Sequence, residues 1–263
     1  MILLILKKRI QNCFAHRRTL RDMSVSLVKG KYAGLKLGAW WIIILPLALA
    51  LCINFVFVEA FKVDIPYFAF FVLSAIFPWF FISQSVSESA NAFIAARSLL
   101  KQGVFPREFI PISNVLANFL NFAYGLLVII PLFLLINTAV IYLLPLLILV
   151  IFLSLLFALG LGFIFSCLNV FFRDTAHSLP IGLMFWFWIT PVFYSEKMLA
   201  FPYRWFCLLN PATYYISAYR QILYYAKPLC VMELAILLFI SIFFLFIGYL
   251  FYLKNEPEIL KRI

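Results

Sequence analysis

Charged residues are scarce in this sequence: they make up 12% of its 263 residues, whereas 66% of the residues are hydrophobic. In soluble domains roughly a quarter of the residues are charged. The composition therefore excludes an ordinary soluble fold and predicts an integral membrane protein. A chain of this length has room for about six spans with short loops, but not for a separate soluble catalytic domain.

The chain also lacks the motifs of common catalytic and nucleotide sites. Its nine glycines form no G-x-x-x-x-G-K-[ST] run, which excludes an ATP-binding P-loop. Its two histidines stand in no H-E-x-x-H motif and have no acidic cluster around them. The five cysteines show no C-x-x-C spacing and are best explained as small apolar residues. We therefore expect no catalytic residue, metal or cofactor in this chain.

Basic residues are unevenly distributed. Nine of the 21 Lys and Arg precede residue 38, and the apolar run Ala39–Val58 contains none. Hydropathy predicts four further spans, at about 67–86, 110–136, 141–168 and 232–253. A shorter apolar element at 179–193 contains Pro180 and Pro191, which would tilt or break it. With the N-terminus inside, inside segments hold sixteen Lys and Arg and outside segments five, as the positive-inside rule requires.

The predicted fold is all-α, with six transmembrane helices, both termini in the cytoplasm, and short re-entrant external helices between the fifth and sixth spans. Residues 1–37 would form a cytoplasmic amphipathic segment, 38–253 the transmembrane domain and 254–263 a cytoplasmic tail. The net charge of +11 is explained by loops lying beside anionic lipid headgroups. We therefore expect membrane lipids as partners, and no nucleic acid.

The basic N-terminal segment mixes charged and apolar residues, which is typical of a helix lying in the membrane interface. One interpretation is that it only sets the topology. The other is that it also binds an anionic substrate headgroup, since Arg and Lys are the usual phosphate partners. The candidates for that contact are Arg17, Arg18, Arg21, Lys29 and Lys31. Gly30, Gly34 and Gly38 are spaced four apart and predict one closely packed helical face.

Short motifs spread over residues 30 to 215 resemble a known family. Phe105-Pro106-Arg107-Glu108, followed by Pro111, resembles the hallmark of the membrane subunits of ABC exporters of polysaccharides, the ABC-2 permeases. Other matches follow in family order: Tyr32-Ala33-Gly34-Leu35-Lys36-Leu37-Gly38-Ala39-Trp40-Trp41, Phe77-Pro78-Trp79-Phe80-Phe81, Leu168-Asn169-Val170-Phe171-Phe172-Arg173-Asp174, Pro191-Val192-Phe193-Tyr194 and Leu209-Asn210-Pro211.

The resemblance implies a permease subunit, not an enzyme, in the cytoplasmic (inner) membrane. It implies a homodimer with a channel at its interface and two copies of a separate cytoplasmic ATPase, which would bind the ATP and Mg. The implied cargo is a lipid-linked polysaccharide of the O-antigen, capsule or teichoic acid type. An exporter of a drug or other small molecule is the closest alternative. A proton-coupled flippase is less favoured, because no ionisable relay is evident inside the spans.

The resemblance also nominates residues that would contact the ATPase. In the family this contact is made by the segment before the Pro-Arg-Glu motif, here a short predicted helix at 91–100 and the turn after it. The candidates are Asn91, Arg97, Lys101, Pro106, Arg107, Glu108, Arg173 and Asp174. The alternative is a solvated connector, and a proline beside two charged residues predicts a turn in water.

Two features fit the passage of a glycan. The predicted external stretch Phe193–Tyr225 is rich in aromatic rings, which stack well on sugars; an interfacial aromatic belt is the alternative. Asparagines at i, i+4 and i+7 give the third span one polar face, either lining a channel or bonding to a neighbouring helix. The candidates for the glycan path are Tyr194, Tyr203, Trp205, Tyr214, Tyr215, Asn114, Asn118 and Asn121.

Overall fold

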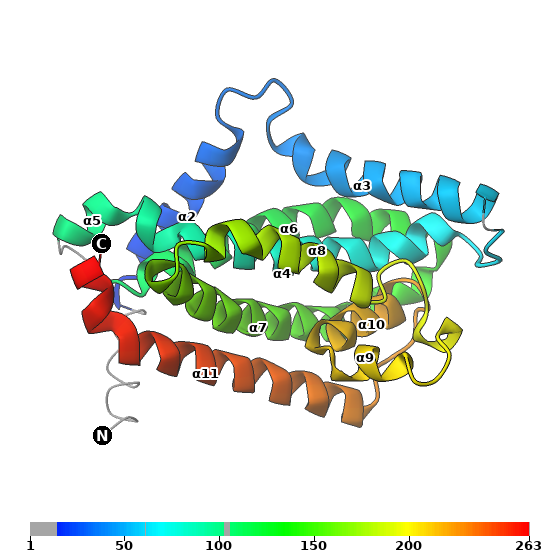
Figure 1. Cartoon of the computed structure of the whole chain (residues 1–263). Helices are drawn as coiled ribbons and strands as arrows, with labels where there is room; N and C mark the ends of the chain where they lie inside the picture. Colours follow the sequence, from blue (N-terminus) through cyan, green and yellow to red (C-terminus); the bar gives the residue numbers. More distant parts are fainter. Residues whose placement is uncertain (1–14, 61, 103–105, 263) are drawn as a thin grey trace.

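The protein is built from helices joined by short turns, as a computed structural model of the chain shows (Figure 1). The structure describes residues 15–60, 62–102 and 106–262, and no β-strand occurs in these ranges. Five segments in this part are long and apolar enough to cross a membrane: Gly38–Glu59, Phe68–Ala95, Phe109–Ile136, Thr138–Phe171 and Val231–Ile259. The all-α class is confirmed, and these five segments overlap the five long spans predicted by hydropathy.

The central element is α4 (Phe68–Ala95), whose most apolar window is 72% buried. It contacts α3 (Trp41–Asn54), α6 (Phe109–Ile136), α7 (Leu144–Phe171) and α10 (Pro211–Leu223). The prediction ended this span at residue 86, and the structure extends it to Ala95, because its polar last turns are covered by other helices. Asn91 therefore belongs to α4, and the short helix expected at 91–100 is instead α5 (Arg97–Gln102).

The backbones of α7 and α11 (Val231–Arg262) approach each other closely. A Cβ added to Gly248 would collide with the carbonyl oxygen of Gly160, so only glycine allows the two backbones to touch. Ser241 reinforces the crossing by donating a hydrogen bond to the Leu153 carbonyl at 2.9 Å. Because α11 runs unbroken to Arg262, the predicted tail after residue 253 continues the helix.

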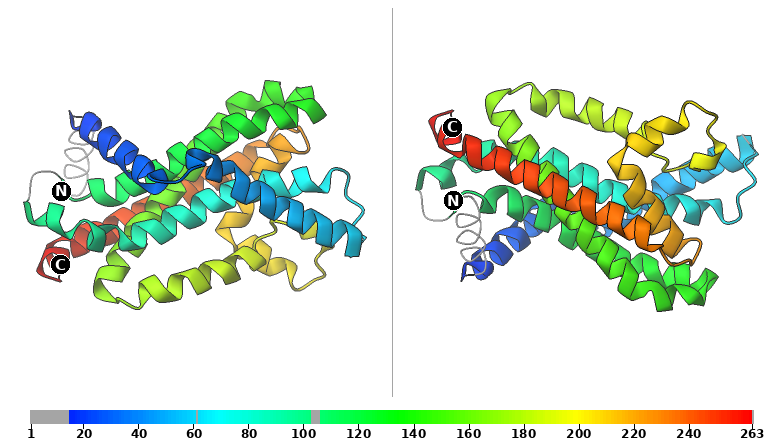
Figure 2. Two further views of the ribbon diagram at one scale, coloured as in Figure 1. Left: turned by 90° about the horizontal axis from the view of Figure 1, so that it is seen from above. Right: turned by 90° about the horizontal axis from the view of Figure 1, so that it is seen from below.

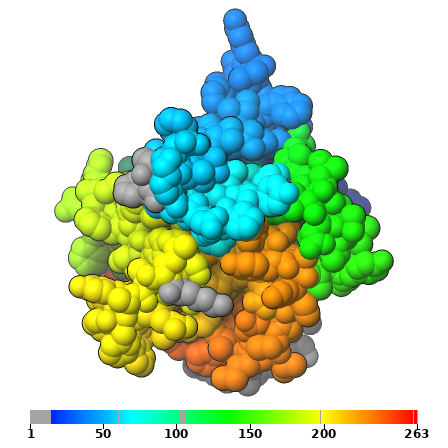
Figure 3. All heavy atoms as spheres, turned by 90° about the vertical axis from the view of Figure 1, so that its right-hand side faces the viewer, coloured from blue at the N-terminus to red at the C-terminus, as the bar shows by residue number. Residues whose placement is uncertain are grey.

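The predicted close-packed face of Gly30, Gly34 and Gly38 is wrong. Gly34 and Gly38 have φ values of 79° and 50° and form the turn from α2 (Arg17–Tyr32) to η1 (Gly38–Trp40). Among the described residues, no atom outside the local backbone lies within 4 Å of a Cβ added to any of the three. This turn stands clear of the bundle, as the end-on view shows (Figure 3).

The first two helices pack unequally on the rest. The described part of the amphipathic segment, α2, buries Leu20 and Ser24 against α6; residues 1–14 lie outside the described part. The span formed by η1, α3 and η2 (Phe55–Ala60) is only 17% buried in its apolar window. It therefore leaves apolar side chains open to a bilayer or to another protein surface.

The element predicted at 179–193 is α8 (Thr175–Ile189). Its 15 residues rise about 22 Å, less than a hydrocarbon core of about 30 Å. After it come η4 (Glu196–Met198), α9 (Arg204–Leu209) and α10. Figure 2 shows α8 and α9 on one flank of the bundle and the α6–α7 turn, which contains η3 (Thr138–Leu143), on the other.

The contact between Gly248 and Gly160 predicts that replacing a helical glycine by alanine destabilises the protein, although alanine has the higher helix propensity. Gly248→Ala adds about 1 kcal/mol of helix propensity, yet we expect it to lower the thermal midpoint of the purified protein, because its methyl group would push α11 away from α7. Gly30→Ala is the control, because a Cβ there meets open space. We expect this variant to leave the midpoint unchanged or to raise it. Equal midpoints for the two variants would contradict the backbone contact.

Candidate functional site

The nominated coupling residues gather at one end of the bundle, which we name the α5 end; the opposite end is the α10 end (Figure 1). A cleft of about 340 Å³ opens there, lined by Asn91, Ile94, Arg97, Asn169, Val170, Arg173, Ala176 and Arg262. Three arginines line it, and no carboxylate is among these lining residues. Arg262 also pairs with Glu258, its Nη2 lying 4.0 Å from Glu258 Oε2. Such a cleft suits acidic side chains of another protein, because guanidinium binds carboxylates in bidentate fashion.

Asn169 holds the wall of this cleft together. Its Nδ2 donates to the Ala90 carbonyl at 2.9 Å and to Asn91 Oδ1 at 3.2 Å, and its Oδ1 accepts from the Ala176 amide at 3.1 Å. One buried side chain therefore joins α4, α7 and α8. Sequence reasoning missed this role, although Asn169 stands inside one of the family motifs.

The Pro-Arg-Glu turn packs against α11. Arg107 Nη1 lies 3.7 Å from Glu256 Oε1, and Tyr249 Oη donates to Glu108 Oε2 at 3.3 Å. Glu108 is only 1% exposed, so the prediction that both charges lie in water is wrong for this residue. The reason is the length of α11, whose last turns cover the turn before α6.

The remaining coupling candidates border the cleft less closely. Lys101 on α5 and Asp174 before α8 are exposed, and Pro106 is half-buried. Gly103 belongs to the turn predicted after the short helix, and Phe105 is the first residue of the Phe-Pro-Arg-Glu motif. Both lie outside the described residues. Asn91, Arg97 and Arg173 therefore line one cleft, whereas Arg107 and Glu108 contact side chains of α11.

The five basic residues nominated for an anionic headgroup separate into two groups. Arg17, Arg18, Arg21 and Lys29 are exposed on α2, as a headgroup contact requires. Lys31 instead points into the bundle, and its Nζ forms an ion pair of 2.6 Å with Glu88 Oε2. Its charge is therefore balanced within the protein.

Lys31, Glu88 and Asn118 form a closed polar triangle between α2, α4 and α6. Lys31 Nζ donates to Asn118 Oδ1 at 2.8 Å, and Asn118 Nδ2 donates to Glu88 Oε2 at 2.8 Å. Partial burial raises the pKa of the nearby Tyr32 phenol, and the Glu88 carboxylate raises it further. Glu88 lies just after the span predicted at about 67–86, but α4 continues seven residues beyond it.

The three asparagines on α6 do not act as one polar face. Asn118 is fully engaged in the triangle, and half-buried Asn114 donates to the Ile110 carbonyl at 3.0 Å. Asn121 is 6% exposed, and its Oδ1 has no hydrogen-bond partner among the described residues. Asn118 and Asn121 line one cavity and Asn114 another, which separates their environments.

The aromatic candidates also divide by burial. Tyr203 and Trp205 are 63% and 52% exposed near the α10 end. Tyr215 is fully buried and shares a hydrogen bond of 2.6 Å with Ser241, so in this conformation it cannot stack on a sugar. Tyr194 and Tyr214 are half-buried, and each donates its hydroxyl hydrogen to a backbone carbonyl.

Arg220 on α10 was predicted only as one of the five basic residues of the outside segments. The structure shows that it has a structural role. It is 5% exposed, and its Nη2 donates to the Pro191 and Val192 carbonyls at 2.8 and 2.6 Å. Its guanidinium also lies 3.8 Å from the centre of the Phe71 ring. Arg220 therefore fastens the segment after α8 to α10 and α4. No signal in the sequence separates it from a surface arginine.

Comparison with known proteins identifies relatives of this chain. The family model of the ABC-2 type transporter matches residues 27–224. A Klebsiella pneumoniae protein described as O-antigen export system permease protein RfbA is 32% identical over 200 residues, which are 74% of this chain and 76% of that protein. A Myxococcus xanthus protein of the same description is 30% identical over 232 residues, 82% of this chain and 84% of that protein.

The chain therefore belongs to the ABC-2 type transporter family, and the resemblance inferred from its motifs is confirmed. Members of this family are membrane subunits of transporters. The matched region begins within α2 and ends just after α10. It thus includes the α5-end cleft except for Arg262, and the whole of the polar triangle.

The polar triangle predicts a double-mutant cycle. Lys31→Met leaves the Glu88 carboxylate without its cation, and Glu88→Met leaves the ammonium group alone; each should destabilise the protein by about 2 kcal/mol. The double variant should cost clearly less than the sum of the two. Thermal midpoints of the purified variants measure this, with exposed Lys29→Met as a control expected to stay near wild type. Additive losses would show that the pair does not interact.

Proposed function

We propose that this chain is the permease subunit of an ABC exporter that carries a lipid-linked polysaccharide across the cytoplasmic membrane, driven by a separate ATPase. The observation that carries the proposal is the similarity to two O-antigen export permeases over 74% and 82% of the chain. The all-helical fold and its apolar spans fit such a role. Because the chain has no P-loop, ATP and Mg would be bound by the partner subunit.

In this proposal the α5 end faces the cytoplasm, together with both chain termini. The distribution of basic residues supports that orientation, since α2, α5 and the last turn of α11 carry many Lys and Arg. The ATPase would place acidic side chains in the cleft between Arg97, Arg173 and Arg262. Movement of the partner would then reach α4, α7 and α8 through Asn169, which is bonded to residues of α4 and α8 from its position on α7.

Six crossings follow if α8 serves as the fifth. Because its helix is shorter than a hydrocarbon core, the segment after it and the short helices α9 and α10 would complete the passage. Non-helical backbone at membrane depth is tolerated where protein covers it. The Arg220 hydrogen bonds to the Pro191 and Val192 carbonyls supply such cover.

The glycan would pass between two copies of the chain, as the family's homodimeric arrangement implies. Exposed apolar side chains on α3 and α8, among them Leu45, Phe185 and Trp188, fit an interface with a second copy or with lipid. At the α10 end, Tyr203 and Trp205 offer exposed rings for weak sugar contacts. On α2, the exposed side chains of Arg17, Arg18, Arg21 and Lys29 would meet the anionic part of the lipid carrier. Of these, Arg21 also pairs with the neighbouring Asp22, its Nε lying 3.5 Å from Asp22 Oδ1.

The proposal is tested by deleting the gene for this chain in its own organism. We expect surface polysaccharide to disappear and lipid-linked glycan to accumulate inside the cell, with both effects reversed when the chain is supplied again. The purified chain should hydrolyse no ATP until the partner ATPase is added. Normal surface polysaccharide together with increased sensitivity to a drug would instead establish a small-molecule exporter. ATP hydrolysis by this chain alone would reject the proposal that a separate ATPase subunit hydrolyses the ATP.

A further inference from the structure

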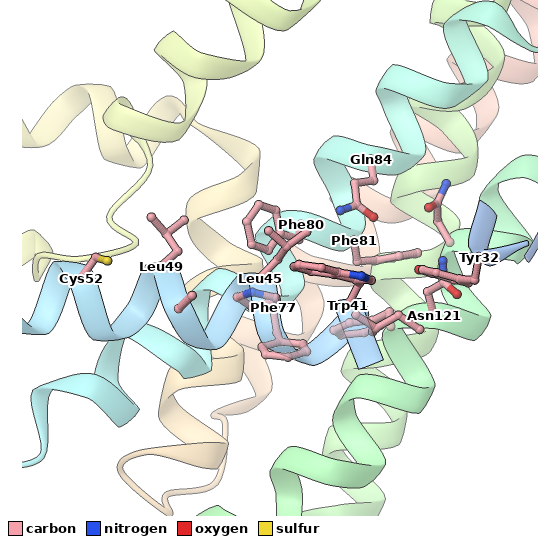
Figure 4. Close-up of a pocket in the computed structure, with 15 residues that line it drawn as sticks. Tyr32, Trp41, Leu45, Leu49, Cys52, Phe77, Phe80, Phe81, Gln84 and Asn121 are labelled. Atoms are coloured by element: carbon pink, nitrogen blue, oxygen red, sulfur yellow. The ribbon is translucent and has the colours of Figure 1, made fainter. Parts of the chain in front are cut away.

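A cavity of about 520 Å³ lies between α3, α4 and α6 (Figure 4). This volume lies within the range of small-molecule sites, about 300–1,000 Å³. The cavity exists because α3 buries few residues against the bundle, among them Ile43 and Ala50. No side chain of the described residues fills it, although α3 forms one of its walls.

The cavity is polar at one end and apolar at the other. Tyr32, Gln84 and Asn121 gather at the end near α2, whereas Leu49 and Cys52 lie at the far end, with phenyl rings between them (Figure 4). A ligand that fits both ends must itself be an amphiphile, with its head toward α2 and its hydrocarbon chain along α3. This direction places the head at the level where α2 packs on the bundle.

The head must be uncharged, because none of the fifteen described lining residues is Lys, Arg, Asp or Glu. A phosphate or ammonium group would be buried there without a counter-charge, which is strongly unfavourable. Lys31 and Glu88, which bond to the lining residue Asn118, are already paired with each other at 2.6 Å. The protonated Tyr32 phenol and the amides supply only neutral donors and acceptors.

Asn121 specifies what the head must offer. Its Oδ1 is a buried acceptor without a partner among the described residues, whereas the amide of neighbouring Asn118 is occupied by Lys31 and Glu88. Buried polar atoms are nearly always hydrogen-bonded, so an occupant that donates an O–H would complete the site. Trp41 and Phe80, which also line the cavity, provide ring surface of the kind that stacks on sugar carbons.

We propose that this cavity binds one neutral lipid whose head carries hydroxyl groups, such as an alkyl glycoside, and that the bound lipid fastens α3 to α4 and α6. The site contains Asn118 and Asn121, two of the asparagines nominated for the glycan path, but the binding of a lipid there does not depend on the export of a polysaccharide. The head hydroxyl donates to Asn121 Oδ1, and the hydrocarbon chain lies along α3 as far as Cys52. The lipid thereby replaces the side-chain packing that α3 lacks.

The test uses the full chain purified in lauryldimethylamine oxide, which carries no hydroxyl group. Dodecyl maltoside is titrated in, and bound molecules are counted by native mass spectrometry while the thermal midpoint is followed. Dodecylphosphocholine, which has the same chain length but a zwitterionic head without hydroxyl groups, is titrated in parallel. We expect one tightly held maltoside per chain, a raised midpoint, and weaker binding of dodecylphosphocholine.

Three variants decide the assignment. Asn121→Leu should weaken maltoside binding about tenfold, the loss expected for one buried hydrogen bond, and Ala48→Trp, which fills the cavity from α3, should abolish it. Asn114→Leu makes the same change on the same helix outside this cavity, and should bind within about twofold of wild type. Equal binding by Asn121→Leu and wild type, or by the two amphiphiles, would overturn the proposal. The proposal would also be overturned if wild type held no maltoside and Ala48→Trp no longer formed a dimer. That result would show that a second copy of the chain fills the cavity.

Discussion

The structure depends on the burial of α4. In a hydrocarbon core every backbone polar group must be paired within the protein, so the chain forms long helices, and one of them must be surrounded by the others. α4 takes that place because Phe71, Ile76 and Ile82 are fully buried along it, and α3, α6, α7 and α10 pack around it. Both the α5-end cleft and the α3 cavity are bounded by this helix, so a movement of α4 would change both sites.

Hydropathy was sufficient to predict the apolar spans, because uninterrupted apolar runs determine where a helix can cross a bilayer. It failed where helices are covered by protein. The polar turns of α4 around Glu88 have the composition of a solvated loop, yet α2 and α6 cover them and Lys31 balances the charge. The predicted length of α8 was correct, but the helix begins and ends four residues earlier than predicted. Hydropathy also could not show how the segment after Ile189 is stabilised.

Contacts between distant parts of the sequence were the least predictable part of the candidate site. Gly160 and Gly248 have no local feature that distinguishes them from Gly30, which faces open space. Tyr203 and Tyr215 belong to the same aromatic stretch, but only Tyr203 is exposed. Arg97 precedes one family motif and Arg173 lies in another, and the structure brings both to one cleft at the α5 end. Their contact with the ATPase stays a prediction.

The central claim is that the α5 end receives the ATPase while the α10 end lies across the membrane from it. The most direct measurement places the photo-reactive amino acid benzoylphenylalanine at Arg97, Arg173 or Tyr203 and irradiates the chain together with its partner ATPase. The account predicts cross-links to the ATPase from positions 97 and 173 and none from position 203, although Tyr203 is 63% exposed. A cross-link from position 203, or none from either α5-end position in an assembled complex, would contradict it.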